Sequence, residues 1–373
     1  MSANRILNTL AMSAALSVAF VSSSFAQEEY QRPELNPAER VTAAREAALA
    51  EQADSGDRVF GGNEADKGEW PFQVALLYSP RLDSSAASQA QAQFCGASLI
   101  APNWVLTAAH CLSDGQVGEW APRPSDVTVL VGATALTEGR RFKPEKFFVN
   151  EGWTGVSVDN DIALIKLAEA TSTPTIALPS GPDPDTGKAM VIGWGLVEGG
   201  VAPVDLMETE IEMVPNATCN SGLKSIYKND LQRLLKSWAS KMRFSDDSIA
   251  SASEALAGTM ADPLTDNMMC AGLQKGGRDA CNGDSGGPLF VQTPEGNRQL
   301  GIVSWGDGPV DADLACGHEN AWGVYTRISR YSDWIETVIA ANGGRAEPGA
   351  ADGGEAAGGS DDGVGTAEKP AAQ

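Results

Sequence analysis

The 373-residue sequence is poor in basic residues and has no long apolar run after its first 26 residues. Its 27 Lys and Arg stand against 49 Asp and Glu, which gives a formal net charge of -22. Because contacts to phosphates need clustered Lys and Arg, we do not expect nucleic acid as a partner. A membrane span takes roughly 20 apolar residues, so we expect no membrane span either.

The sequence also lacks the usual patterns of metal sites. No two of its six cysteines have Cys-x-x-Cys spacing, and no acidic calcium loop follows His110. We therefore expect no metal and no other cofactor. An even number of cysteines suits disulfides in an oxidising compartment, but six cysteines allow about 15 pairings.

Residues 1–26 have the pattern of a secretory signal peptide. A short polar region with Arg5 precedes a mostly apolar run over residues 10–21, and Ser24-Phe25-Ala26 resembles a cleavage site. The alternative, a transmembrane anchor, fits less well because serines interrupt the run and it is too short. We expect a secreted or periplasmic protein.

Composition divides the remaining chain into three parts. Residues 27–58 are polar and lack a strong apolar stripe, which predicts a weakly structured pro-segment. Residues 59–342 contain strand-length apolar runs separated by turn signals, which predict an all-β barrel or sandwich. Residues 343–373 are rich in Gly, Ala, Asp and Glu, which predicts a disordered acidic tail. The runs are 72–78, 97–106, 127–132, 162–167, 190–194, 289–292, 300–305 and 323–328, and a helix-like stretch follows at 331–341.

One segment, about 220–266, breaks the β pattern, because apolar residues recur there at helical spacing between residues 222 and 244. We expect an inserted amphipathic helix whose apolar face packs against the β domain. Its basic face also allows an exosite or a membrane-surface role. The apolar residues are Leu223, Ile226, Tyr227, Leu231, Leu234, Leu235, Trp238 and Met242, and the basic residues are Lys228, Arg233, Lys236 and Lys241.

The most specific local pattern is Gly283-Asp284-Ser285-Gly286-Gly287-Pro288. A serine hydroxyl needs a base to become a good nucleophile, and an acyl-transfer intermediate needs N–H donors around its oxyanion. Glycines beside a serine allow the backbone to supply these donors. The same string would also suit a simple turn.

Histidine is the natural base, since its ordinary pKa lies near neutrality. Of the two histidines, His110 follows an apolar run, whereas His318 lies in a loop and is expected to be an ordinary surface or core residue. A carboxylate must then hold the imidazole. Asp161 and Asp159 both precede an apolar run, and these residues alone do not decide between them.

Motifs in a fixed order carry a family resemblance. Thr107-Ala108-Ala109-His110-Cys111, Asp159-Asn160-Asp161-Ile162-Ala163-Leu164 and the Ser285 motif occur in that order, and further motifs extend the match over most of residues 59–340. The sequence resembles the chymotrypsin and trypsin family of serine endopeptidases. The further motifs are Arg58-Val59-Phe60-Gly61-Gly62, Cys95-Gly96-Ala97-Ser98-Leu99, Gly193-Trp194-Gly195, Ser304-Trp305-Gly306 and Gly323-Val324-Tyr325-Thr326.

The resemblance implies two six-stranded antiparallel β-barrels with the active site between them, followed by a C-terminal helix. It implies a catalytic triad of His110, Asp161 and Ser285, which excludes Asp159, and an oxyanion hole formed by the N–H groups of Gly283 and Ser285. The implied disulfides are Cys95–Cys111, Cys219–Cys270 and Cys281–Cys316.

Activation and specificity are also implied by the resemblance. Cleavage after Arg58, by another protease or by the enzyme itself, would free the ammonium of Val59 to pair with Asp284. Substrates would be proteins or peptides cleaved after Arg, and after Lys second, because Asp279 occupies the floor of the S1 pocket. The implied S1 residues are Asp279, Ala280, Ser304, Trp305, Gly306 and Gly323.

Some features depart from the family pattern. The 307–315 loop and the Cys219–Cys270 segment are longer than usual, and Trp322 stands where many members have proline. Both insertions border the binding cleft and would narrow the range of substrates, so a processing protease of narrow specificity is one alternative. A catalytically inactive binding protein on the same scaffold would share the fold without the activity. An enzyme with an apolar pocket would also share the fold, but Asp279 opposes it.

Overall fold

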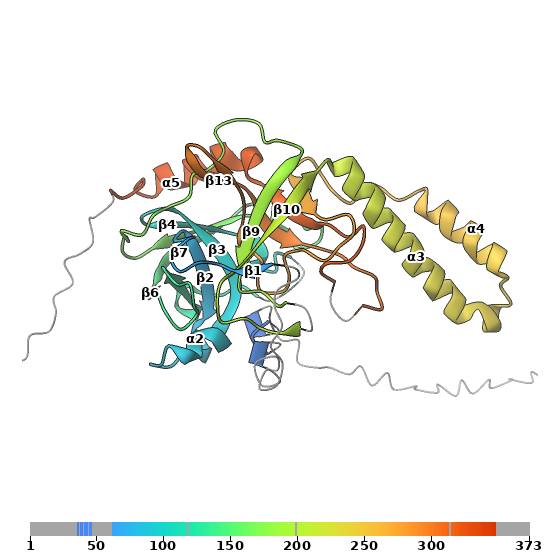
Figure 1. Ribbon diagram of the computed structural model, residues 1–373, viewed down its shortest axis with the longest axis horizontal. Helices are drawn as coiled ribbons and strands as arrows, with labels where there is room; N and C mark the ends of the chain where they lie inside the picture. The colour runs from blue at the N-terminus through green and yellow to red at the C-terminus, as the bar shows by residue number, and fades with distance from the viewer. Residues whose placement is uncertain are drawn as a thin grey trace, which may run out of the picture. The chain divides into compact units, whose positions relative to one another are not determined.

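The computed structural model describes residues 36, 38–39, 41–43, 45–46, 62–116, 118, 120–197, 200–312 and 315–347. Their strands form two seven-stranded sheets in which all neighbouring strands are antiparallel (Figure 1). The predicted signal peptide, residues 1–26, and its predicted cleavage site lie outside the described residues.

The N-terminal sheet has the strand order β6-β5-β2-β3-β4-β8-β7. Its central strands are buried along nearly their whole length, so their sequences are continuous apolar runs instead of alternating ones. Among the described residues no ladder joins β6 to β7, so this sheet is curled without being closed. The strands are β2 (Gln73–Tyr78), β3 (Gln93–Ala101), β4 (Trp104–Thr107), β5 (Val127–Val131), β6 (Arg140–Phe142), β7 (Pro144–Val149) and β8 (Ala163–Leu167).

The C-terminal sheet closes into a six-stranded barrel, because β9 pairs with both β12 and β10. The short strand β1 adds to β10 outside this ring. The strands are β1 (Asn63–Glu64), β9 (Gly187–Gly193), β10 (Met207–Val214), β11 (Met268–Gly272), β12 (Pro288–Thr293), β13 (Gly296–Trp305) and β14 (Gly323–Arg327). The expected all-β fold is confirmed, with the C-terminal sheet as a closed six-stranded barrel and the N-terminal sheet as a curled half-barrel.

The predicted C-terminal helix is α5 (Ser332–Ala341). Its Ile335 and Ile339 are buried in the same core cluster as the N-terminal sheet, so α5 connects the end of the chain to that sheet. We expected the chain to leave the domain at residue 343, but the next residues remain packed on it. Trp104 Nε1 donates a 2.9 Å hydrogen bond to Gly344 O, so residues 343–347 still pack on the β3–β4 turn. The rest of the predicted tail, 348–373, lies outside the described residues.

The insertion contains two helices where we predicted one. α3 (Asn216–Met242) and α4 (Asp246–Ala257) lie side by side as a hairpin (Figure 1). We missed α4 because it is rich in Ala and Ser and buries only Ile249 and Ser253, although its cap Ser245 accepts a hydrogen bond from the N–H of Ser248. No described helix is long and apolar enough to cross a membrane.

The predicted packing of α3 on the β domain is correct only for its first turns. Leu223 and Ile226 are buried, but Leu234, Trp238 and Met242 are 54%, 57% and 53% exposed. A 27-residue helix is about 40 Å long, so its far half extends beyond the surface that the first half contacts.

The N-terminal region is better structured than its composition suggested. Residues 38–39, 41–43 and 45–46 are helical, and Ala38, Thr42 and Arg45 have no exposed surface. These three residues are spaced i, i+4 and i+7, which places them on one face of a helix. The expectation of a weakly structured segment is therefore wrong for residues 38–39, 41–43 and 45–46. Arg58 and Val59 lie outside the described residues.

Helix α2 (Ala87–Ala92) precedes β3 and contacts β2.

All three disulfides implied by the family resemblance are present, and they use all six cysteines. The first disulfide joins β3 to the 3-10 turn Ala109–Cys111, which carries His110. The pattern therefore braces the candidate site from the side of the N-terminal sheet.

Candidate active site

His110 and Asp161 form a two-point contact. Asp161 Oδ2 lies 2.8 Å from His110 Nδ1, and Asp161 Oδ1 accepts a 2.9 Å hydrogen bond from the main-chain N–H of His110. Ser304 Oγ donates a further hydrogen bond of 2.5 Å to Oδ2. The carboxylate is buried, with only 1% of the residue exposed. Burial by itself would raise the pKa of Asp161, but the charge of His110 and these hydrogen bonds outweigh it and hold the pKa below its usual value.

Asp159, the competing carboxylate, has a different role. Its oxygens accept hydrogen bonds from Asn267 Nδ2 and Thr265 Oγ1, both at 3.2 Å, so it anchors the segment before β11. His318, the second histidine, packs near the 307–315 loop. If Gly308 had a Cβ atom, that atom would lie 2.9 Å from the His318 ring. The geometry thus pairs His110 with Asp161.

The turn that carries Ser285 packs on strand β3 and on the end of β4. Ser285 O accepts a 2.7 Å hydrogen bond from Gly96 N. It also lies 3.6 Å from the Sγ atom of Cys111, the residue that follows His110. Gly286 has a φ of +84°, and a Cβ there would lie 2.2 Å from Thr107 Oγ1. Only glycine allows this approach, which brings Ser285 to the His110 side of the junction between the sheets.

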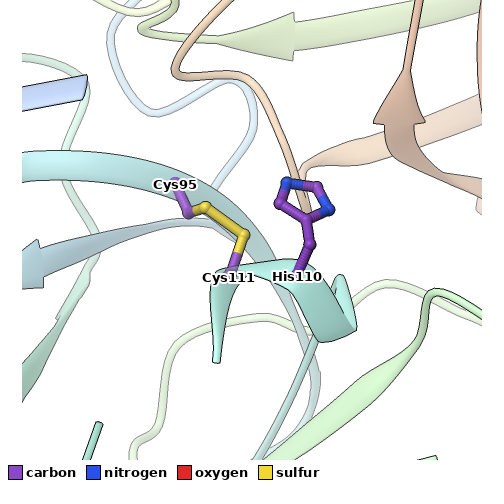
Figure 2. Close-up of side chains that lie close together, drawn as sticks. All are labelled: Cys95, His110 and Cys111. Atoms are coloured by element: carbon purple, nitrogen blue, oxygen red, sulfur yellow. A yellow bond between two sulfur atoms is a disulfide. The ribbon is translucent and has the colours of Figure 1, made fainter. Parts of the chain in front are cut away.

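Cys95, His110 and Cys111 form the one compact group of potential metal-binding side chains in the part of the chain that the structure describes (Figure 2). The two sulfur atoms are bonded to each other, and metal-binding cysteines act as thiolates. We therefore interpret the group as a brace for the His110 turn.

Asp284, next to Ser285, is enclosed by backbone. Its oxygens accept hydrogen bonds from Gly195 N at 2.7 Å and Cys281 N at 2.9 Å. A Cβ on Gly193 or Gly195 would lie 2.0 or 2.3 Å from these oxygens, which explains both glycines of the Gly-Trp-Gly motif. Burial raises the pKa of Asp284 to about 6.

A small cavity extends from Asp284 to strand β10. It is lined by Gly193, Leu196, Met207 and Thr209, among others. Strand β1 lies alongside, since Asn63 pairs with Glu208. The chain just after the predicted cleavage bond therefore enters the described structure close to Asp284.

A second cavity of about 260 Å³ opens beside Ser285. Asp279 lies in its wall, 7% exposed, and accepts hydrogen bonds from Ala280 N at 2.8 Å and Gly317 N at 3.1 Å. Burial raises the pKa of Asp279 to about 7. All six residues predicted for the S1 pocket line this cavity: Asp279, Ala280, Ser304, Trp305, Gly306 and Gly323.

Tyr325 is a lining residue that our sequence reasoning did not assign to this cavity. Its hydroxyl is buried and has no hydrogen-bond partner within the described ranges. A Cβ on Gly323 would lie 2.7 Å from Asp279 Oδ1 and 3.1 Å from this hydroxyl. The Gly-Val-Tyr-Thr motif, which matches the family and contains Tyr325, was the sequence signal from which this lining residue could have been predicted.

The two insertions contact each other near this cavity. Tyr227 of α3 donates a 2.5 Å hydrogen bond to Asp307, and Arg233 pairs with Asp311 at 3.1 Å. Trp322, which departs from the family pattern, packs on the start of α3, where a Cβ on Gly222 would lie 2.2 Å from its ring. Trp322 therefore belongs to the packing of the insertion.

Comparison with known proteins supports the same family. Residues 59–335 match the family model described as Trypsin. The mouse protein named transmembrane protease serine 11C is 32% identical over 288 residues, covering 75% of this chain and 53% of the relative. Mouse transmembrane protease serine 11G is 31% identical over 291 residues, covering 75% and 55%. The chain thus spans about half the length of these curated relatives. It belongs to the trypsin family of serine endopeptidases.

Proposed function

We propose that this chain is a secreted or periplasmic serine endopeptidase that cleaves after Arg, and less efficiently after Lys. The observation that carries the proposal is the cavity beside Ser285, which has the buried carboxylate of Asp279 in its wall. The paired His110 and Asp161 support catalysis over the alternative of an inactive binding protein.

In the proposed mechanism Ser285 Oγ attacks the scissile carbonyl while His110 accepts the hydroxyl proton. Asp161 stays ionised, orients the imidazole through Nδ1 and stabilises its charged form. The N–H groups of Gly283 and Ser285 stabilise the oxyanion of the tetrahedral intermediate. His110 then protonates the leaving amine, and the acyl-enzyme is hydrolysed by a water that His110 deprotonates.

Specificity in the proposal depends on the ionised form of Asp279. A substrate guanidinium can donate two parallel hydrogen bonds to a carboxylate, whereas an ammonium acts as a point charge. Ala280 offers no hydroxyl to a substrate ammonium, which favours Arg over Lys. The contact between Tyr227 and Asp307 is consistent with a restricted set of substrates, because it holds two insertions near the cavity.

We propose that cleavage after Arg58 activates the enzyme. The new ammonium of Val59 would enter the cavity beside Asp284 and pair with its carboxylate, which orders the neighbouring oxyanion hole. The route is supported by β1, since Val59 precedes Asn63 by only four positions and Asn63 already pairs with Glu208 beside the cavity.

The experiment is a cleavage profile on a peptide library, with enzyme cut after Arg58 and the Ser285→Ala variant treated identically. We expect cleavage after Arg and Lys that the variant lacks. Cleavage after other residues only, or equal activity of the variant, would contradict the proposal.

A further inference from the structure

Arg45 is completely buried, although it belongs to the polar N-terminal segment. Its guanidinium donates hydrogen bonds to Ala90 O at 2.9 Å, to Pro203 O at 3.0 Å and to Trp194 O. The carbonyl group of Ala90 belongs to helix α2, that of Pro203 to the segment before β10, and that of Trp194 to the loop after β9. Arginine is almost never fully buried unless it is paired, so this is a built site for a guanidinium.

The site is electrostatically suited to a cation. Burial lowers the pKa of Arg45 to about 10, while attraction to Asp284 acts in the opposite direction. The guanidinium therefore remains charged at neutral pH. Trp194, which accepts one of its hydrogen bonds, directly precedes Gly195, whose N–H binds Asp284. The Arg45 site thus adjoins the carboxylate of Asp284, the proposed partner of the Val59 ammonium.

The other described residues of the segment support docking through one helix face. Ala38 and Thr42 are fully buried on the same face as Arg45, and Val41 packs against the large core cluster to which the N-terminal sheet belongs. Glu46 forms an exposed ion pair with Arg81 at 2.8 Å. Arg45 is therefore the anchor of a larger contact.

No covalent bond would hold this segment after cleavage. The first cysteine of the chain is Cys95, and all six cysteines pair within the peptidase domain. We propose that the carbonyl groups of Ala90, Trp194 and Pro203 form a binding site for Arg45 that retains the N-terminal fragment noncovalently after cleavage at Arg58. This inference rests on the proposed activation at Arg58.

The test uses the full chain carrying Ser285→Ala and a C-terminal tag. Ser55→Asp, Gly56→Asp and Arg58→Lys convert residues 54–58 into the enteropeptidase sequence Asp-Asp-Asp-Asp-Lys. After the cut, the tagged domain is captured and washed, and mass spectrometry detects the fragment in the bound and unbound fractions. We expect the fragment in the bound fraction.

Three variants identify the anchor. Arg45→Gln should weaken binding of the fragment roughly 100-fold, because it leaves buried carbonyl groups without a charged donor. Arg45→Lys should weaken it roughly tenfold, since an ammonium cannot span three acceptors as a guanidinium does. Glu46→Gln, the matched control, should change it less than about threefold because its ion pair is exposed.

The proposal is overturned if the unmodified fragment washes off. It is also overturned if the fragment carrying Arg45→Gln is retained to the same extent as the unmodified fragment. If Arg45→Gln prevents folding, a synthetic peptide of residues 34–48 should displace the bound fragment, and the same peptide with Arg45→Gln should not. The engineered cut makes retention independent of natural activation. Failure of the proposed function would instead appear as absent proteolysis by the Ser285 enzyme.

Discussion

Asp161 contacts His110 twice, at the ring Nδ1 and at the main-chain N–H. The two contacts together fix the position and the orientation of the imidazole. Ser304 adds a hydrogen bond to the same carboxylate, which satisfies a buried charge that would otherwise be costly.

Asp161→Asn should leave the fold intact and lower kcat by about 10⁴-fold, the value already established for the equivalent substitution in this enzyme family. The physical reason is that an amide can stabilise the wrong tautomer of His110. Steady-state kinetics on an Arg substrate would measure the loss. Asp159→Asn is the matched control and should retain most of the activity, so equal losses in the two variants would contradict the assignment.

Ala280→Ser should raise the Lys to Arg ratio of kcat/KM several-fold, because a hydroxyl next to Asp279 can accept a hydrogen bond from a substrate ammonium. The expected gain corresponds to roughly 1 kcal/mol, the usual net value of one hydrogen bond. Paired peptides that differ only in Arg or Lys at the cleaved position would measure it. An unchanged ratio would mean that the substrate side chain does not lie next to residue 280, which would contradict the proposed S1 pocket.

Affinity for benzamidine, whose amidinium resembles a guanidinium, should rise with pH between about 5 and 8. Burial raises the pKa of Asp279 to about 7, so the carboxyl is mostly protonated at pH 5 and cannot attract a cation. Below that pKa the affinity should increase about tenfold per pH unit. Isothermal titration across this range gives the slope. A flat profile, or the same slope in Asp279→Asn, would refute the role of Asp279.

Self-activation is expected, because Arg58 matches the proposed specificity. A Ser285→Ala precursor expressed alone should therefore keep its N-terminal segment, as judged by intact mass. Wild-type precursor should lose the bond between Arg58 and Val59 under the same conditions. Normal processing of the variant would assign activation to another protease.

The family resemblance carried by the ordered motifs implied the two-barrel fold, the three disulfides and the grouping of His110 with Asp161. Composition and spacing alone had left the cysteine pairing and the choice between Asp159 and Asp161 open. The burial of Arg45 could not be predicted in this way. It depends on carbonyl groups that lie 45, 149 and 158 positions away in the chain. Polar composition around Arg45 instead suggested a loose segment.

The insertion shows the same limit. Helical spacing predicted α3 but not which of its turns contact the domain, because that depends on where the second barrel ends. Leu223 and Trp238 have equivalent places in the pattern, yet Leu223 is buried and Trp238 is 57% exposed. Helix α4 has capping signals but almost no apolar stripe, so periodicity could not reveal it.

The most direct test of the account is a burst titration with 4-nitrophenyl 4-guanidinobenzoate, an ester that carries a guanidinium. Enzyme cut after Arg58 should release one equivalent of nitrophenol in a burst, and peptide mass mapping should find the guanidinobenzoyl group on Ser285. Asp279→Asn should strongly reduce the burst rate. No burst, acylation at another residue, or an unchanged burst rate in Asp279→Asn would contradict the account.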